Sequence, residues 1–124
     1  MTALSLPDYF KPKTKPFAHQ RTALARSFNK RNFALFMEQG TGKSKVIIDN
    51  AHLLYDKGHI DALVVIAPNE VHVQWIREQV PEHMPTHIKT RCVAWGQSTR
   101  AKTQTKELAA RVEKEIGRAS CRER

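Results

Sequence analysis

A glycine-rich turn at residues 40–44, with the sequence GTGKS, is the feature that most constrains how this 124-residue chain can fold. A short apolar run, residues 32–37, precedes the turn, and residues 43–55 follow it with apolar side chains at helical spacing. Gly40 and Gly42 let successive backbone N–H groups converge on an anion, and the positive end of the following helix adds to the attraction. The pattern therefore predicts a strand, a phosphate-binding loop and a helix, in that order.

The polar residues of this loop have chemical roles in that interpretation. Lys43 would place its ammonium group against the β and γ phosphates of a nucleotide, which makes it the catalytic candidate. Ser44 would offer its hydroxyl to the Mg²⁺ that accompanies ATP. The full motif has glycine where this chain has Met37, so a glycine-rich turn with a solvated lysine stays open as the alternative. The candidate cofactor-binding residues in the loop are Glu38, Gln39, Gly40, Thr41, Gly42, Lys43 and Ser44.

An upstream glutamine suggests a contact with the base of the same nucleotide. Gln20 lies 23 positions before Lys43, at the start of a helical pattern over residues 18–29 and just after Phe17. A glutamine amide can pair with N6 and N7 of adenine, and an aromatic ring can stack on the base. We therefore add Phe17 and Gln20 to the candidate cofactor-binding residues; an ordinary surface position on a helix is the alternative for Gln20.

The rest of the chain alternates between helical and strand-like patterns. Residues 62–67 (ALVVIA) are continuously apolar and β-branched, as in strands that are covered on both faces, and a third strand is expected at 90–95. Helical spacing recurs over 71–80 and 102–114, and Lys57-Gly58 ends the helix that follows the loop. Strands that alternate with helices predict an α/β fold with a parallel sheet. A sheet of about three strands is small for this class, which suggests a truncated domain.

The last nine residues, 116–124 (IGRASCRER), do not continue the helical pattern before them. The nucleotide string ATCGGAAGAGCGTCGTGTAGGGAAAGA encodes them and looks like a common short-read sequencing adapter. We therefore expect a non-native, adapter-derived tail, with an ordinary basic tail as the alternative. The formal net charge of +9 becomes +7 without the tail, and Cys121 is removed with it.

Composition narrows the class of protein. The positive charge favours a polyanionic partner such as nucleic acid or nucleotide phosphate, and prolines alternate with lysines in an extended basic lead-in over residues 1–16. Two cysteines are too few for a disulfide framework, which suggests a reducing cytoplasm. The strongly apolar run at 62–67 is far shorter than the roughly 18 residues of a membrane-spanning helix, so we expect no membrane span.

Three segments together resemble the opening of a superfamily 2 helicase, most closely the Swi/Snf-type DNA translocases of phage and bacteria. They are KPFAHQRTAL, FMEQGTGKSKVIID and ALVVIAPNEVHVQWIRE, and the resemblance covers roughly residues 10–95. It implies that residues 17–115 are the N-terminal part of a RecA-like P-loop NTPase lobe that binds ATP and Mg²⁺. Gln20 would match the adenine-reading glutamine, and the loop would match motif I, which in this family commonly lacks the first glycine.

The resemblance also implies a nucleic-acid partner, expected to be double-stranded DNA, and a location in the bacterial or phage-infected host cytoplasm. Pro68 and Asn69 would match motif Ia, which lies where the lobe meets a nucleic-acid backbone; Trp75 and Glu78 would match the element that follows it. Asn69 starts a sequence, NEVH, that looks like the acidic DExH box, but it lies only 26 positions after Lys43, too early for that box. A strand-to-helix turn with Asn69 as N-cap is the alternative.

No adjacent Asp-Glu pair occurs in the chain, and the second RecA-like lobe of the family, with its arginine fingers, is missing. We therefore expect ATP binding without efficient hydrolysis. Three other interpretations stay open: another superfamily 2 helicase, of the RNA or restriction type; a stand-alone, non-catalytic nucleotide or nucleic-acid binding module; and a different phosphate-loop enzyme such as a small kinase.

Overall fold

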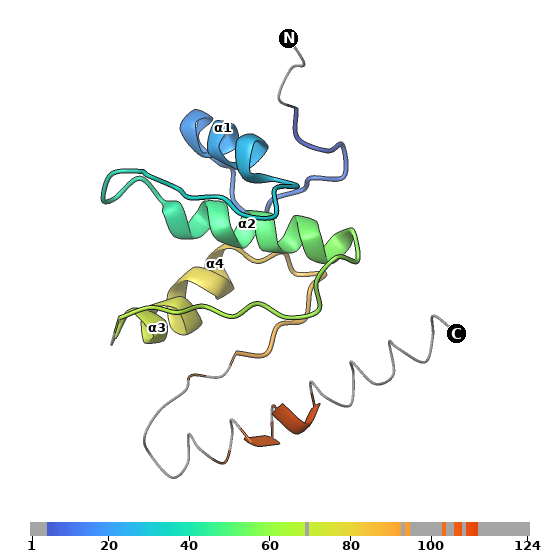
Figure 1. Ribbon diagram of the computed structural model, residues 1–124, viewed down its shortest axis with the longest axis vertical. Coiled ribbons are helices and arrows are strands. Elements are labelled where there is room, and N and C mark those ends of the chain that lie inside the picture. The colour runs from blue at the N-terminus through green and yellow to red at the C-terminus, as the bar shows by residue number, and fades with distance from the viewer. Residues whose placement is uncertain are drawn as a thin grey trace. The chain divides into compact units, whose positions relative to one another are not determined.

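The computed structural model describes residues 5–68, 70–92, 94, 103, 106, 107 and 109–111, and the chain divides into two units, Met1–Lys89 and Thr90–Arg124. Within the described part, the first unit consists of helical elements joined by loops (Figure 1). They are α1 (Ala18–Ser27), α2 (Lys43–Asp56), α3 (Val71–Gln74), the π-helix η1 (Trp75–Gln79) and α4 (Val80–His83). In the second unit, the described residues 103, 106, 107 and 109–111 are helical.

Helix α2 is the centre of the first unit, because it packs against both α1 and α4 (Figure 1). Leu24 of α1 and the α2 residues Val46 and Leu53 form a cluster of fully buried side chains. Burying a side chain of this size contributes about 1.5–3 kcal/mol, so the cluster fixes α1 on α2. Partly buried apolar residues surround it: Leu6, Phe10, Ala23, Phe28, Leu35 and Met37.

Both long helices end at residues with positive φ. Asn29 (φ 66°) follows α1, and Gly58 (φ 76°) follows α2. After α2, the N–H of Gly58 donates to the carbonyl of Tyr55 at 2.9 Å and the N–H of His59 donates to that of Leu54 at 2.8 Å. This pair of bonds is the Schellman arrangement, which needs a left-handed residue at the glycine position. The predicted helix end at Lys57-Gly58 is therefore confirmed.

The helical stretch from Val71 to His83 widens into the π-helix η1 immediately before α4. Pro81 explains the change, because proline has no N–H to donate and its ring clashes with the carbonyl four residues earlier in a regular α-helix. Trp75 of η1 is buried. The predicted helices at 18–29, 43–55 and 71–80 are all present, with ends that differ by a few residues.

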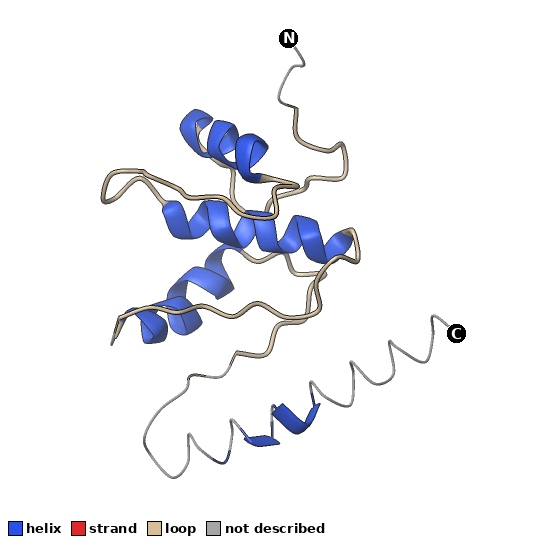
Figure 2. Ribbon diagram, viewed as in Figure 1, coloured by secondary structure: helices blue, strands red, loops and turns tan. Residues whose placement is uncertain are grey.

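The predicted α/β fold with a parallel sheet, and with it a truncated RecA-like lobe, is wrong for the described residues, which contain helices and loops and no strand (Figure 2). Segments 32–37 and 62–67, expected as buried strands, are loops whose outward side chains Phe36, Val64 and Ile66 are 84–98% exposed. A covered strand needs neighbouring strands to pair with its N–H and C=O groups, and no described segment pairs with either one.

These two segments nevertheless keep an alternating exposure. Leu35 and Met37 pack against the core on either side of Phe36, while Leu63 and Val65 are about half as exposed as Val64 and Ile66. In an extended segment successive side chains point to opposite sides, so the two sides can differ in exposure. The expectation that both faces of these segments are covered is therefore wrong, because one face of each is exposed.

Individual positions also differ from the pattern expected from the sequence. Ile47, one of the apolar residues at helical spacing in 43–55, is 38% exposed, and Leu54 is half-buried, whereas Val46, Ile48 and Leu53 are buried. Cys92, expected inside a buried strand, is exposed, and residues 90–92 are not a strand. Asn69, Trp95, most of the helix expected at 102–114 and the tail at 116–124 lie outside the described residues.

In the part of the chain that the structure describes, no helix has both the length and the apolar character needed to cross a membrane.

Candidate nucleotide-binding site

The loop before α2 has the backbone that its glycines were predicted to supply. Gly40 and Gly42 adopt φ angles of 75° and 78°, in the left-handed region that favours glycine. Gly42 is also the N-cap of α2, so the helix begins at Lys43, directly beneath the loop. The first N–H groups of a helix have no partner within it and carry its positive end. The loop therefore leads straight into a helix terminus suited to an anion.

Lys43 lies against the loop that it is predicted to serve. Its Nζ donates to the carbonyl oxygens of Met37 at 2.7 Å and Glu38 at 3.1 Å. The carbonyl of Glu38 also accepts a hydrogen bond from the Thr41 hydroxyl at 2.6 Å, which closes the loop on itself. Two neutral carbonyls hold the ammonium group, and no carboxylate pairs with it in the described residues. An anionic phosphate would bind this cation more strongly than either carbonyl does.

Ser44, the predicted Mg²⁺ ligand, is half-buried in the first turn of α2. Among the described residues its hydroxyl makes no hydrogen bond, so an oxygen ligand is available beside Lys43. The neighbouring loop residues Glu38 and Gln39 are exposed. The backbone of Glu38, rather than its side chain, contributes to the loop.

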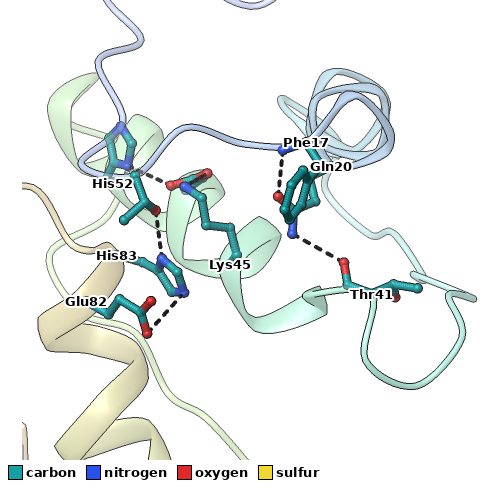
Figure 3. A network of polar contacts seen from close by, with 9 residues as sticks. Phe17, Gln20, Thr41, Lys45, His52, Glu82 and His83 are labelled. Carbon is teal, nitrogen blue, oxygen red and sulfur yellow. Dashed lines mark hydrogen bonds and ion pairs between the residues drawn. The ribbon is translucent and has the colours of Figure 1, made fainter.

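Gln20 joins α1 to the loop (Figure 3). Its side chain is buried at 6% exposure, its Oε1 accepts from the backbone N–H of Phe17 at 2.9 Å, and its Nε2 donates to the carbonyl of Thr41 at 3.2 Å. The bond from Phe17 is one half of a capping box, because a glutamine in the third helical position binds the N-cap N–H. Oε1 has a second lone pair, so accepting a hydrogen bond from adenine N6 would not require it to give up Phe17.

An aromatic pair stands beside Gln20 at the start of α1. The Phe17 ring is 70% exposed and stacks on the imidazole of His19, with centroids 5.8 Å apart and planes inclined by 12°. His19 Nε2 lies 2.9 Å from the carbonyl oxygen of Thr41, the same atom that Gln20 binds. The Phe17, Gln20 and loop residues predicted from the sequence thus meet in one place. His19 was not among the predicted residues, although its position between Phe17 and Gln20 was a usable signal.

A second polar cluster, also absent from the predicted site, lies buried along α2 (Figure 3). Lys45 Nζ is 2.5 Å from Oδ2 of Asp49, and both residues are at most 4% exposed. His52, one turn further on, is 1% exposed and stacks on Phe10 with centroids 5.4 Å apart. Its Nδ1 lies 3.8 Å from Oδ1 of Asp49, beyond hydrogen-bond distance, and neither ring nitrogen has a hydrogen-bond partner in the described structure. Their spacing at i, i+4 and i+7 was the signal for a shared helix face.

Burial dominates the electrostatics of this cluster. It lowers the pKa of His52 to about 4, an effect that nearby Asp56 only partly opposes. It raises the pKa of Asp49 despite the hydrogen bond and charge of Lys45. The pKa of His83 in α4 is also lowered by burial, and its Nδ1 lies 2.8 Å from the Thr14 hydroxyl. The cluster holds α2 against the lead-in and α4 and forms no metal site among the described residues.

The predicted nucleic-acid contacts are only partly described. Pro68 is exposed, and its carbonyl accepts from the N–H of Val71 at the start of α3. Asn69 lies outside the described residues, and the N-cap of α3 is Glu70, which has a φ of 75°. Glu78 is exposed beside Gln74. The structure therefore gives Pro68 an accessible position and does not bring it into the loop.

The comparison with protein families gives a match over residues 13–116 to the family described as "Type III restriction enzyme, res subunit". The comparison with curated proteins and that with solved structures found no match. The family match includes α1, the loop and α2, and it indicates a superfamily 2 helicase-like N-terminal domain. The Swi/Snf-type subfamily is not confirmed. The chain belongs to the family of type III restriction enzyme res subunits.

Proposed function

We propose that this chain is the ATP-binding N-terminal segment of an ATP-dependent DNA translocase or helicase. The observation that carries the proposal is the contact of α1 with the phosphate loop, in which the Gln20 amide donates to the carbonyl oxygen of Thr41. This contact links a base-reading residue to a loop whose glycine conformations and lysine suit a triphosphate. Of the helicase families that the sequence left open, the family match favours a restriction-type enzyme over the Swi/Snf type.

The residues present fit ATP and Mg²⁺. Lys43 would exchange its two carbonyl partners for phosphate oxygens, the first N–H groups of α2 would face the phosphates, and Ser44 would supply a hydroxyl to the metal. Bound Mg²⁺ neutralises charge on the phosphates. Phe17 would present its exposed ring to the base, and Gln20 would lie beside it. Glu38, Gln39, Gly40, Thr41 and Gly42 would supply the remaining backbone of the site.

We further propose that this chain binds ATP without hydrolysing it efficiently. Phosphoryl transfer needs a residue that positions the attacking water, together with charge on the leaving phosphate. The sequence contains no Asp-Glu pair to hold and activate the water, and the described site brings no second carboxylate to Lys43. These residues would then bind and position ATP, and hydrolysis would depend on additional groups that activate the water and stabilise the phosphate charge.

The test is to measure nucleotide binding and phosphate release with the same purified chain. We expect saturable binding of Mg·ATP together with phosphate release at the level of buffer alone. Absence of ATP binding would contradict the proposed function. Phosphate release above background that disappears in Lys43→Ala would contradict the statement that the chain does not hydrolyse ATP efficiently.

Double-stranded DNA is the proposed polyanionic partner, with Pro68 and Asn69 at the contact. The formal charge of +7 that remains without the tail at 116–124 supports electrostatic binding to a phosphate backbone, whose affinity falls steeply as salt increases. Anisotropy titrations of labelled DNA and RNA duplexes at two salt concentrations test this part. We expect tighter binding to the DNA duplex and weaker binding at the higher salt concentration; equal affinity for both duplexes would contradict the choice of DNA.

A further inference from the structure

We infer that His19 is a nucleotide-site residue that connects the Phe17 ring to the phosphate loop. We call the stacked rings of Phe17 and His19 the base platform. The inference rests on the proposed function, because it assigns a role at the same ATP site. It starts from the two contacts of His19, one with the Phe17 ring and one with the Thr41 carbonyl.

The stacking contact makes a platform from two rings. Phe17 and His19 lie nearly parallel, at 12°, with their centroids 5.8 Å apart, and both residues are exposed. A single exposed phenyl ring on the N-cap of a helix rotates about its side-chain bonds. Fixing such a ring against a ligand costs conformational entropy. His19 limits that rotation before any base arrives. The affinity for a base stacked on the platform would then be reduced less by the entropy cost of ordering the Phe17 side chain.

The polar contact joins this platform to the loop. His19 Nε2 donates to the Thr41 carbonyl at 2.9 Å when that nitrogen carries the proton, and Gln20 Nε2 donates to the same oxygen at 3.2 Å. A carbonyl oxygen has two lone pairs, so both donors are accommodated. Thr41 lies between Gly40 and Gly42, the two residues with left-handed backbone. The bond therefore holds the loop between its two left-handed residues.

Gln20 and His19 have different roles because Gln20 is buried and His19 is exposed. Gln20 is 6% exposed and uses Oε1 on Phe17 and Nε2 on Thr41, so it acts first as a link within the protein. His19 is exposed, and its ring is the part of this link that solvent, and hence a nucleotide, reaches. His19 is accordingly a positioning residue for the loop and a contact residue for the base platform.

Two substitutions separate these roles. His19→Ala removes the ring and the donor, whereas His19→Phe keeps a stacking ring and removes only the donor. Mg·ATP and inorganic tripolyphosphate, which has no base, are titrated against each form of the full chain by calorimetry. His59→Ala is the matched control, because His59 is an exposed histidine beyond the far end of α2.

We expect His19→Ala to weaken ATP binding about tenfold and tripolyphosphate binding about threefold. His19→Phe should weaken both about threefold and leave their ratio unchanged, and His59→Ala should change neither. Far-ultraviolet circular dichroism and the thermal midpoint should stay those of the unchanged chain, since His19 is exposed.

The results that overturn the inference differ from those that overturn the proposed function. If the unchanged chain binds ATP and His19→Ala binds it within twofold of that affinity, His19 has no role at the site. If His19→Phe shifts the ratio of the two affinities as much as His19→Ala does, the shared platform is wrong. If the unchanged chain binds neither ATP nor tripolyphosphate, the proposed function itself fails, and this inference with it.

Discussion

A β-carbon on Gly42 would overlap the side-chain amide nitrogen of Gln20, so the loop glycine and the helix glutamine are complementary in shape. The Gln20 amide occupies this space because it donates to the Thr41 carbonyl, one residue before the glycine. Gly42 thus has two independent reasons to be glycine, its φ of 78° and the close approach of α1. Gly40 has only the first, since a β-carbon there would meet open space.

This difference predicts unequal effects of the same substitution. Gly42→Ala should lower the free energy of unfolding by ~2–4 kcal/mol, because it combines left-handed strain with displacement of Gln20. Gly40→Ala should lower it by only ~1 kcal/mol, from strain alone. Urea denaturation of both variants measures the difference. Equal losses would show that Gln20 does not lie against the loop.

The buried pair of Lys45 and Asp49 predicts a strong loss of stability when one partner is removed. Asp49→Ala would leave the Lys45 ammonium buried without its counter-charge, at a cost of ~3–5 kcal/mol in the free energy of unfolding. The double variant Lys45→Met/Asp49→Leu should recover most of that loss, since an apolar pair of similar volume needs no counter-charge. Asp61→Ala, at an exposed carboxylate, is the control and should change little. A double variant no more stable than Asp49→Ala would contradict the pairing.

His52 predicts that the protein becomes less stable in acid. Its pKa is about 4 in the folded chain against 6.5 when unperturbed, so the unfolded state binds a proton that the folded state excludes. Stability should therefore be complete above about pH 6.5 and decrease as the pH falls toward 4, by at most ~3 kcal/mol from this group. His83, whose pKa is also lowered, acts in the same direction; Asp49, whose pKa is raised, opposes it by favouring the folded state at lower pH.

The measurement is the urea midpoint between pH 7.5 and 4.5, for the unchanged chain and for His52→Leu. The substitution removes an imidazole whose two nitrogens have no hydrogen-bond partner, so the slope with pH should flatten without loss of stability at pH 7.5. His59→Leu changes an exposed histidine and should keep the original slope. If His52→Leu also keeps it, His52 is not the group that titrates.

Local signals in the sequence predicted the helices and the loop well. The helical spacing of apolar residues located α1 and α2, Lys57-Gly58 located the end of α2, and the two glycines located the left-handed turns. Each of these depends on residues within about one helical turn of each other, which is the range over which sequence patterns act. The predicted sheet is wrong because the apolar run at 62–67 becomes a strand only if distant segments pair with it, and no described segment does.

The contacts of the site show the same limit. Phe17, Gln20 and the loop residues were proposed separately, and the bond between Gln20 and Thr41 joins segments 21 residues apart. No local pattern predicts that His19 binds the same carbonyl, or that Lys45, Asp49 and His52 are buried while Ile47 is exposed. Polar residues are usually placed on the solvent side of a helix from sequence, and here tertiary packing places them against the lead-in and α4.

Calorimetric titration of Mg·ATP into the unchanged chain and into Lys43→Ala tests the account most directly. The Lys43 ammonium bridges the Met37 and Glu38 carbonyls and is the cation that a phosphate would meet, so its removal should weaken ATP binding by at least tenfold. Lys89→Ala removes an exposed lysine and should bind ATP like the unchanged chain. Saturable binding that Lys43→Ala abolishes and Lys89→Ala preserves is the predicted result; equal binding by all three forms would contradict a nucleotide site at this loop.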